Sequence, residues 1–156
     1  MSGVLYIVST PIGDPGDITL RALATMKTVD LIVCEEHKEG SKLLKQYQIE
    51  KPLETLNEHN EETQSDRILQ RLLEGEKIAL IADCGTPAIA DPGATLVHAC
   101  LKKGIKIIPL PGASSLTAAL SVCGLRLDRF FFIGFLPPKT QERRLELTRV
   151  KRMPQP

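Results

Sequence analysis

The sequence contains no long hydrophobic run and no closely paired cysteines. Its apolar stretches fall well short of the roughly 20 residues that a membrane-spanning helix needs. No basic stretch precedes the first apolar run, residues 4–8, so we expect neither a membrane span nor a signal peptide. Cys34, Cys84, Cys100 and Cys123 form no Cys-x-x-Cys pair, and the three histidines are equally scattered. This spacing argues against a disulfide framework or a metal site and favours free thiols in a reducing cytoplasm.

Two common nucleotide-binding motifs are also missing. The sequence has no Gly-x-x-x-x-Gly-Lys-Ser/Thr pattern, which makes a P-loop site improbable. Gly13 and Gly16 do not form a Gly-x-Gly-x-x-Gly pattern, so a dinucleotide fingerprint is unsupported. Asp83 and Thr86 would suit an aspartyl-phosphate phosphatase only with a second carboxylate at position 85, which is Gly85. These absences exclude three classes of site but do not identify the ligand.

Strand-like and helix-like patterns alternate along most of the chain. Strands are predicted at residues 5–9, 31–34, 53–56, 78–82, 105–110 and 130–133. Helices are predicted at residues 18–28 with Asp17 as N-cap, 41–48, 60–74 with Asn60 as N-cap, 91–104 with Asp91 as N-cap and Pro92 at the first helical position, and 114–122. This alternation is typical of an α/β fold, an open and largely parallel sheet with helices on both faces.

A break at Pro137-Pro138 separates this pattern from a charged segment. We expect an α/β domain over residues 1–136, and a linker with the start of a second domain over residues 137–156. From Lys139 onward six basic residues stand against two acidic ones, a balance of +4, whereas the remainder carries −3. Such a run can contact phosphates. We favour a solvated helix or linker, because the run is short and has no interleaved aromatic residues.

Three loops rich in glycine and proline follow three of the predicted strands. They cover residues 10–16, 83–87 and 109–115. In a parallel sheet all three would share one edge, which is where open α/β sheets bind ligands. Small residues let a ligand approach the backbone, and a helix starting near Ser114 offers free N–H groups. The sequence therefore predicts a ligand cleft at this edge, with Asp83 at the end of its strand.

Ordered motifs over residues 5–145 resemble the tetrapyrrole (corrin/porphyrin) methylase superfamily, and within it the methyltransferases of small-subunit ribosomal RNA. The motifs lie at residues 6–13, 16–19, 57–61, 83–87, 91–93, 109–114, 128–130 and 134–137. The resemblance implies the N-terminal domain of a class III-type methyltransferase, with S-adenosyl-L-methionine as methyl donor. It also implies 2′-O-methylation of a cytidine in small-subunit ribosomal RNA, in the cytoplasm. No membrane partner is implied, and a homodimer is left open.

The resemblance also carries over individual residues. The residues that would line the methyl donor are Pro11, Gly13, Asp83, Gly85, Thr86, Pro87, Ser114 and Ser115. Residues 35–38 depart from the family pattern, of which this chain retains only Glu35. The family carries a second α/β domain after residues 134–137, which completes the cofactor cleft.

A ribose hydroxyl is a poor nucleophile when it is neutral, so a general base would assist methyl transfer. Glu58 and His59 are the candidates, and a solvated or helix-capping role is the alternative for each. Asp83 fits a cofactor contact better than a base. Two other functions stay open: a tetrapyrrole (precorrin/porphyrin) C-methyltransferase, and a catalytically silent truncated domain.

Overall fold

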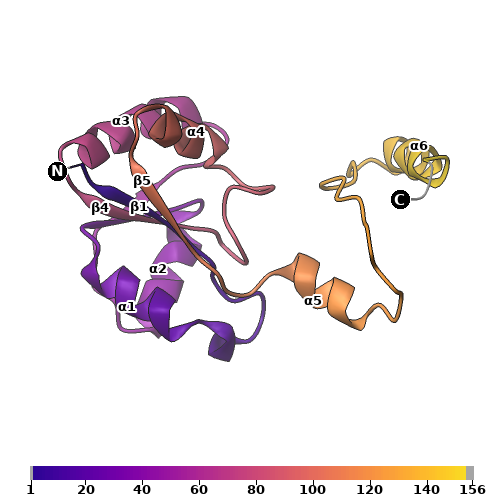
Figure 1. Ribbon diagram of the computed structural model, residues 1–156, viewed down its shortest axis with the longest axis horizontal. Coiled ribbons are helices and arrows are strands. Elements are labelled where there is room, and N and C mark those ends of the chain that lie inside the picture. Colours follow the sequence, from indigo (N-terminus) through magenta and orange to yellow (C-terminus); the bar gives the residue numbers. More distant parts are fainter. Residues whose placement is uncertain (1, 154–156) are drawn as a thin grey trace. The chain divides into compact units, whose positions relative to one another are not determined.

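The protein is described by a computed structural model that covers residues 2–153. The chain divides into two compact units, Met1–Ala118 and Ala119–Pro156. The first unit contains the sheet, and Figure 1 shows helices on both of its faces. The described residues of the second unit, 119–153, form one complete helix and a long irregular segment. We describe each unit by itself.

The first unit is built on a five-stranded sheet. Its strands are β1 (Val4–Val8), β2 (Leu31–Cys34), β3 (Leu53–Thr55), β4 (Lys77–Ile81) and β5 (Lys106–Leu110). They lie in the order β3-β2-β4-β1-β5, and every neighbouring pair is parallel. The predicted open parallel α/β sheet is confirmed.

Helices connect the strands over both faces of the sheet. The first unit contains the 3-10 turn η1 (Pro15–Asp17) and the helices α1 (Leu20–Thr28), α2 (His37–Gln46), α3 (Glu61–Leu73) and α4 (Ala94–Lys102). The helix α5 (Ser115–Val122) crosses the boundary between the units, and α6 (Thr140–Lys151) lies in the second unit. Figure 1 shows α1 and α2 on one face of the sheet and α3 and α4 on the other.

Two apolar layers hold these helices to the sheet. Along β4, Ile78 and Leu80 pack toward α3 and α4, while Ala79 and Ile81 pack toward α1 and α2. This alternation follows from the two-residue period of a strand. Each fully buried large apolar side chain stabilises the fold by about 1.5–3 kcal/mol. Because β2 and β4 are covered on both faces, they have the continuous apolar sequences that are typical of central parallel strands.

Several predicted helix starts are wrong. The N-cap of α1 is Thr19, whose side chain accepts from the Ala22 N–H, and Asp17 instead belongs to η1. Helix α2 begins at His37, four residues before the prediction. Helix α4 begins after Gly93 rather than at Asp91.

The start of α4 has a physical cause that is distant in sequence. The Glu61 carboxylate accepts from the Gly93 N–H at 2.8 Å and from the Thr95 N–H at 3.2 Å. A side chain from the first turn of α3 therefore caps the N-terminus of α4 in place of a local N-cap residue. This contact also holds the loop after β4 against α3.

The predicted sixth strand is wrong. Residues 130–133 have no regular structure, and Phe130 to Ile133 are all exposed. A strand is stable only when its backbone groups pair with a neighbour, and this segment forms no such ladder.

Candidate functional site

The site lies at the carboxyl ends of the central strand β4 and its neighbour β1. These strands are neighbours, and the chain leaves β1 toward α1 but leaves β4 toward α4. Because α1 and α4 cover opposite faces, the loops after β1 and β4 diverge at this point. Open α/β sheets bind ligands in the crevice at such a switch point.

A two-way backbone bridge joins the loop after β1 to the loop after β4. The Thr10 N–H donates to the Gly85 carbonyl at 2.8 Å, and the Gly85 N–H donates to the Thr10 carbonyl at 3.1 Å. The Thr10 hydroxyl, which is buried, also donates to the Ala82 carbonyl at 3.1 Å. Gly85 has a φ of 80°, a conformation that favours glycine. The bridge fixes the position of Asp83 and Thr86 on either side of it.

Hydroxyl contacts extend this link to the loop after β5. The Ser9 and Thr86 hydroxyls lie 2.7 Å apart, and the Thr86 hydroxyl donates to the Ala113 carbonyl at 3.5 Å. A Cβ at Gly112 would lie 2.9 Å from the Cβ of Ser9, so only glycine fits there without displacement. The structure thus brings the three glycine- and proline-rich loops to one edge.

The same edge is acidic. Burial raises the pKa of Asp83, and the negative charges of Glu36, Glu39 and Asp91 raise it further. A hydrogen bond of 3.3 Å from the Glu36 N–H to Asp83 Oδ1 partly opposes this rise. Burial also raises the pKa of Glu35, with Asp83 as the next cause. Negative charge therefore accumulates here, which favours a cationic group on a bound ligand.

A cavity of about 140 Å³ adjoins Asp83. Its walls come from the loop after β1, from α2 and from Asp83 itself. The lining residues are Pro11, Gly13, Pro15, Glu39, Lys42, Leu43, Gln46, Tyr47 and Asp83. The Tyr47 hydroxyl donates to the Pro15 carbonyl at 2.7 Å, which holds the loop after β1 against α2. Ligand pockets usually measure about 300–1,000 Å³, so this cavity would hold only part of a cofactor.

The eight predicted cofactor residues do not all line this cavity. Pro11, Gly13 and Asp83 do, and a Cβ at Gly13 would meet nothing within 4 Å. Gly85, Thr86 and Pro87 follow Asp83 around the bridge, with Gly85 and Pro87 buried. Ser114 and Ser115 lie at the start of α5, where the Ser114 carbonyl accepts from the Thr117 hydroxyl.

Glu58 and His59 lie at the end of β3, on the turn that leads into α3. Their side chains are 82% and 85% exposed, and His59 Nε2 lies 3.7 Å from Glu58 Oε1. A hollow of about 380 Å³ is lined by residues 58–63 and Thr95. The negative charge of Glu58 contributes to the raised pKa of Glu35, so the two carboxylates belong to the same acidic edge.

The sequence profile of the tetrapyrrole (corrin/porphyrin) methylases matches residues 4–154. The chain belongs to this family. It is 48% identical over 152 residues to a protein of Xylella fastidiosa (strain Temecula1 / ATCC 700964) named ribosomal RNA small subunit methyltransferase I, covering 97% of this chain and 56% of that protein. It is 45% identical over 152 residues to the protein of that name from Escherichia coli O157:H7, covering 97% and 53%. The chain thus spans about half the length of these relatives.

Solved structures of methylase-fold proteins resemble the chain in three dimensions. Uroporphyrin-III-C-methyltransferase from Thermus thermophilus aligns with a TM-score of 0.63 at 25% identity, covering 83% of this chain and 56% of that one. Diphthine synthase aligns with a TM-score of 0.66 at 22% identity, covering 83% and 52%. These similarities show that the chain has the methylase fold.

Four residues that shape this edge of the sheet were not among the predicted site residues: Ser9, Thr10, Tyr47 and Glu61. Ser9 and Thr10 directly follow β1, so their place at a strand end was the available signal. Tyr47 and Glu61 act on loops that are 32 residues away in sequence. No local pattern marks such contacts, because they depend on which helices pack side by side.

Residues 2–153 contain neither a membrane-spanning helix nor a side-chain cluster suited to a metal ion. No helix in this range is long and apolar enough to cross a bilayer. No group of three or more histidine, cysteine, aspartate or glutamate side chains in this range is arranged to hold a metal ion.

Proposed function

We propose that the chain is the donor-binding part of an S-adenosylmethionine-dependent methyltransferase that acts on small-subunit ribosomal RNA. The observation that carries this proposal is the identity of 45–48% over 97% of the chain to relatives named for that activity. Identity to the uroporphyrin C-methyltransferase is only 25%. This difference supports a ribosomal RNA acceptor over a tetrapyrrole. The compartment we propose for the reaction is the cytoplasm. The acceptor atom we propose is the 2′-hydroxyl of a cytidine.

The residues at the carboxyl edge of the sheet suit this cofactor. When bound, S-adenosylmethionine supplies an electrophilic methyl group on a positively charged sulfur. Burial is the largest cause of the raised pKa of Asp83 and of Glu35, and neighbouring negative charge raises both further. A cationic ligand would partly neutralise that charge. Gly13 leaves the backbone open to close approach, since a Cβ there would meet nothing within 4 Å. The ligand charge and the acidic edge are therefore complementary.

Within this proposal each loop has its own task. Asp83 binds a polar or cationic group of the donor, and the backbone at Gly85, Thr86 and Pro87 packs along it. Pro11 and Gly13 form the neighbouring wall, and Ser114 and Ser115 present N–H groups at the start of α5. Correct positioning and exclusion of water supply most of the rate of an in-line methyl transfer.

Deprotonation of a ribose hydroxyl needs a nearby base. Glu58 and His59 are the proposed candidates, because both lie at the acidic edge and both side chains are free to reach a substrate. The carboxylate of Glu61 is already committed to the start of α4, so we exclude it from this role.

Calorimetry with S-adenosylhomocysteine tests the donor site. We expect the wild-type chain to bind, more weakly than a full-length relative, because it spans about half of such a protein. The substitution Asp83→Ala should weaken binding by about tenfold, the usual scale for losing one charged contact. Asp66→Ala on the exposed side of α3 is the matched control and should leave binding unchanged. Binding that survives Asp83→Ala would refute the site assignment, and absence of any binding would support a silent domain.

Methyl transfer tests the acceptor. Labelled S-adenosylmethionine is supplied to a full-length relative carrying this domain, with either unmethylated small ribosomal subunits or a precorrin as acceptor. We expect label in the ribosomal RNA, at the ribose 2′-oxygen of a cytidine. Label in the tetrapyrrole alone would overturn the proposal in favour of a C-methyltransferase.

A further inference from the structure

The two units of the chain carry opposite charge. Residues 1–118 contain 12 lysines and arginines and 16 aspartates and glutamates, a net charge of −4. Residues 119–156 contain eight basic and three acidic residues, a net charge of +5. The carboxylates at the sheet edge make the first unit still less suited to hold an anionic polymer. An RNA partner therefore needs cations from elsewhere on the chain.

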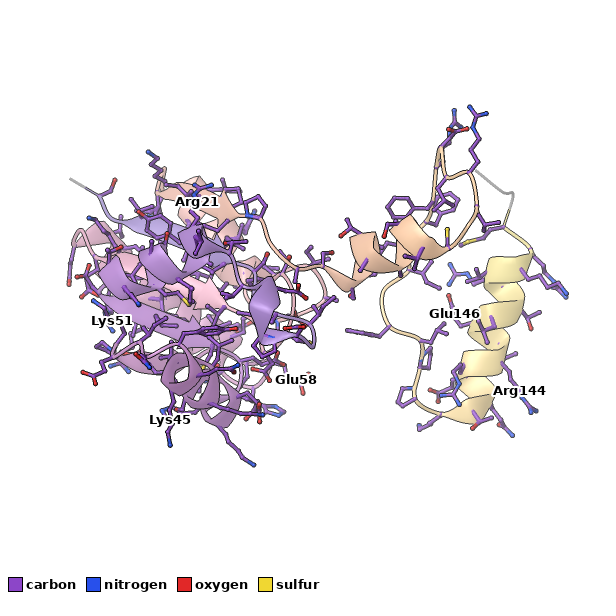
Figure 2. The ribbon with its side chains drawn as sticks, turned by 90° about the horizontal axis from the view of Figure 1, so that it is seen from below. Arg21, Lys45, Lys51, Glu58, Arg144 and Glu146 are labelled. Atoms are coloured by element: carbon purple, nitrogen blue, oxygen red, sulfur yellow. The ribbon has the colours of Figure 1, made fainter. Side chains whose placement is uncertain are left out.

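Helix α6 sorts its charges onto different sides. A helix has 3.6 residues per turn, so Glu142, Glu146 and Arg149 share one side of α6. Arg144 and Lys151, seven residues apart, share the opposite side, and Figure 2 shows Arg144 and Glu146 on different sides of the helix. The segregation is not visible in the linear sequence, where acidic and basic residues alternate.

The ion pairs of α6 leave the basic side available. Glu146 lies 3.6 Å from Arg149, and Glu142 lies 3.3 Å from Lys139. Among the described residues, no ion pair involves Arg144, Lys151 or Arg152, and all three residues are exposed. Two cations on one side of α6 and a third directly after its C-terminal end suit contacts with phosphates.

We propose that the basic side of α6, formed by Arg144 and Lys151, binds the phosphate backbone of RNA together with Arg152, which directly follows the helix. The identity of the RNA rests on the proposed function. The choice of this surface rests on its charge, which is complementary to that of RNA. The contact is independent of base sequence, because arginine and lysine neutralise phosphates without reading bases. It orients the substrate and leaves recognition of the target nucleotide to other residues.

Salt-dependent binding tests this surface. Fluorescence anisotropy is measured across a range of salt with a labelled single-stranded segment of small-subunit ribosomal RNA and with an oligouridine of equal length. The triple variant R144Q/K151Q/R152Q should lower the slope of log affinity against log salt by about 2, at roughly 0.7 per lost phosphate contact. Affinity at low salt should fall at least about tenfold for both RNAs.

Two control variants match the triple variant. K102Q/K103Q/K106Q removes the same charge from exposed positions at the other edge of the sheet and should keep most of the slope. R144K/K151R/R152K preserves the charge and should bind like the wild type. Equal loss of slope in both glutamine variants, or no loss in the first, would overturn the proposal, as would an absence of RNA binding by the wild type.

Two further measurements distinguish this proposal from a failed donor site and from binding to a lipid surface. Binding of S-adenosylhomocysteine by R144Q/K151Q/R152Q should equal that of the wild type, so a failed donor site and a failed RNA surface give different results. Vesicles containing phosphatidylserine serve as an anionic surface of another kind. Loss of vesicle binding with retained RNA binding in the glutamine variant would assign α6 to a lipid surface and overturn the proposal.

Discussion

Residues 2–118 and residues 119–153 differ in the burial of their apolar side chains. Every buried apolar residue of the described structure lies in the first region, from Leu5 to Leu110. The second region buries no apolar side chain, and its four phenylalanines are all exposed, between 48% and 84%. Yet both regions contain helices and apolar runs. Apolar composition alone therefore does not produce a core.

Pairing makes the difference between the two regions. The run Ile78–Ile81 lies between two parallel neighbours, β1 and β2, and is covered by helices on both faces. The run from Phe130 to Ile133 has equally strand-like residues but no neighbouring strand. A single strand satisfies none of its own backbone groups, so sequence preference cannot stabilise it.

The largest expected effect compares one leucine in each region. Leu72 in α3 is fully buried, whereas Leu147 in α6 is 48% exposed. We expect Leu72→Ala to lower the free energy of unfolding by about 2–5 kcal/mol, because it leaves a cavity. Leu147→Ala should change it by less than about 0.5 kcal/mol. Urea unfolding followed by circular dichroism measures both.

The same pair of variants can break the comparison. A loss in Leu147→Ala as large as that in Leu72→Ala would mean that α6 contributes to the cooperative core in solution. The contrast between the two regions would then have to be abandoned.

The next effect compares two glycines with positive φ. Gly93 has a φ of 120°, and a Cβ there would lie 2.7 Å from Leu80 Cδ2 in the core. Gly124 has a φ of 71°, and a Cβ there would meet nothing within 4 Å. We expect Gly93→Ala to cost about 2–4 kcal/mol, from strain plus overpacking, and Gly124→Ala about 1 kcal/mol from strain alone.

Thermal unfolding of the two alanine variants measures this difference. Equal losses would show that packing around Gly93 adapts to the methyl group. S-adenosylhomocysteine binding should also fall in Gly93→Ala, because Gly93 ends the loop that carries Asp83 and Thr86.

The fold could be predicted because its signals are local. Strands such as residues 31–34 and 78–82 are short apolar runs bounded by loops, and burial on two faces demands that composition. The start of α4 could not be predicted, since its capping carboxylate comes from Glu61, which is 32 residues away from Gly93. Asp91 and Pro92 form a good local start signal, and a tertiary contact overrides it.

The site could be predicted in part for the same reason. The shared edge of the three loops follows from parallel strands alone. The cavity wall that α2 contributes could not be predicted in this way, because it depends on the hydrogen bond from the Tyr47 hydroxyl to the Pro15 carbonyl. The charge segregation of α6 depends on residues 140–151 forming a helix, which the sequence did not distinguish from a linker.

The smallest expected effect concerns charge rather than packing, and it compares Asp83 with Glu146 of α6. Burial and neighbouring carboxylates raise the pKa of Asp83 above its ordinary value of 3.8, so the folded state holds its proton more tightly than the unfolded state does. As pH falls through the raised pKa toward 3.8, this group therefore adds stability, and at neutral pH its charge is unfavourable. Asp83→Asn should accordingly raise Tm slightly at pH 7, by less than either effect above, and the advantage over the wild type should vanish at low pH. Glu146 is paired with Arg149 on the surface at 3.6 Å, and Glu146→Gln should leave Tm nearly unchanged.

A lower Tm for Asp83→Asn at pH 7 would show that its hydrogen bond to the Glu36 N–H outweighs the charge repulsion. A higher Tm together with lost cofactor binding would show that the core of residues 2–118 supports an acidic edge which is retained for function.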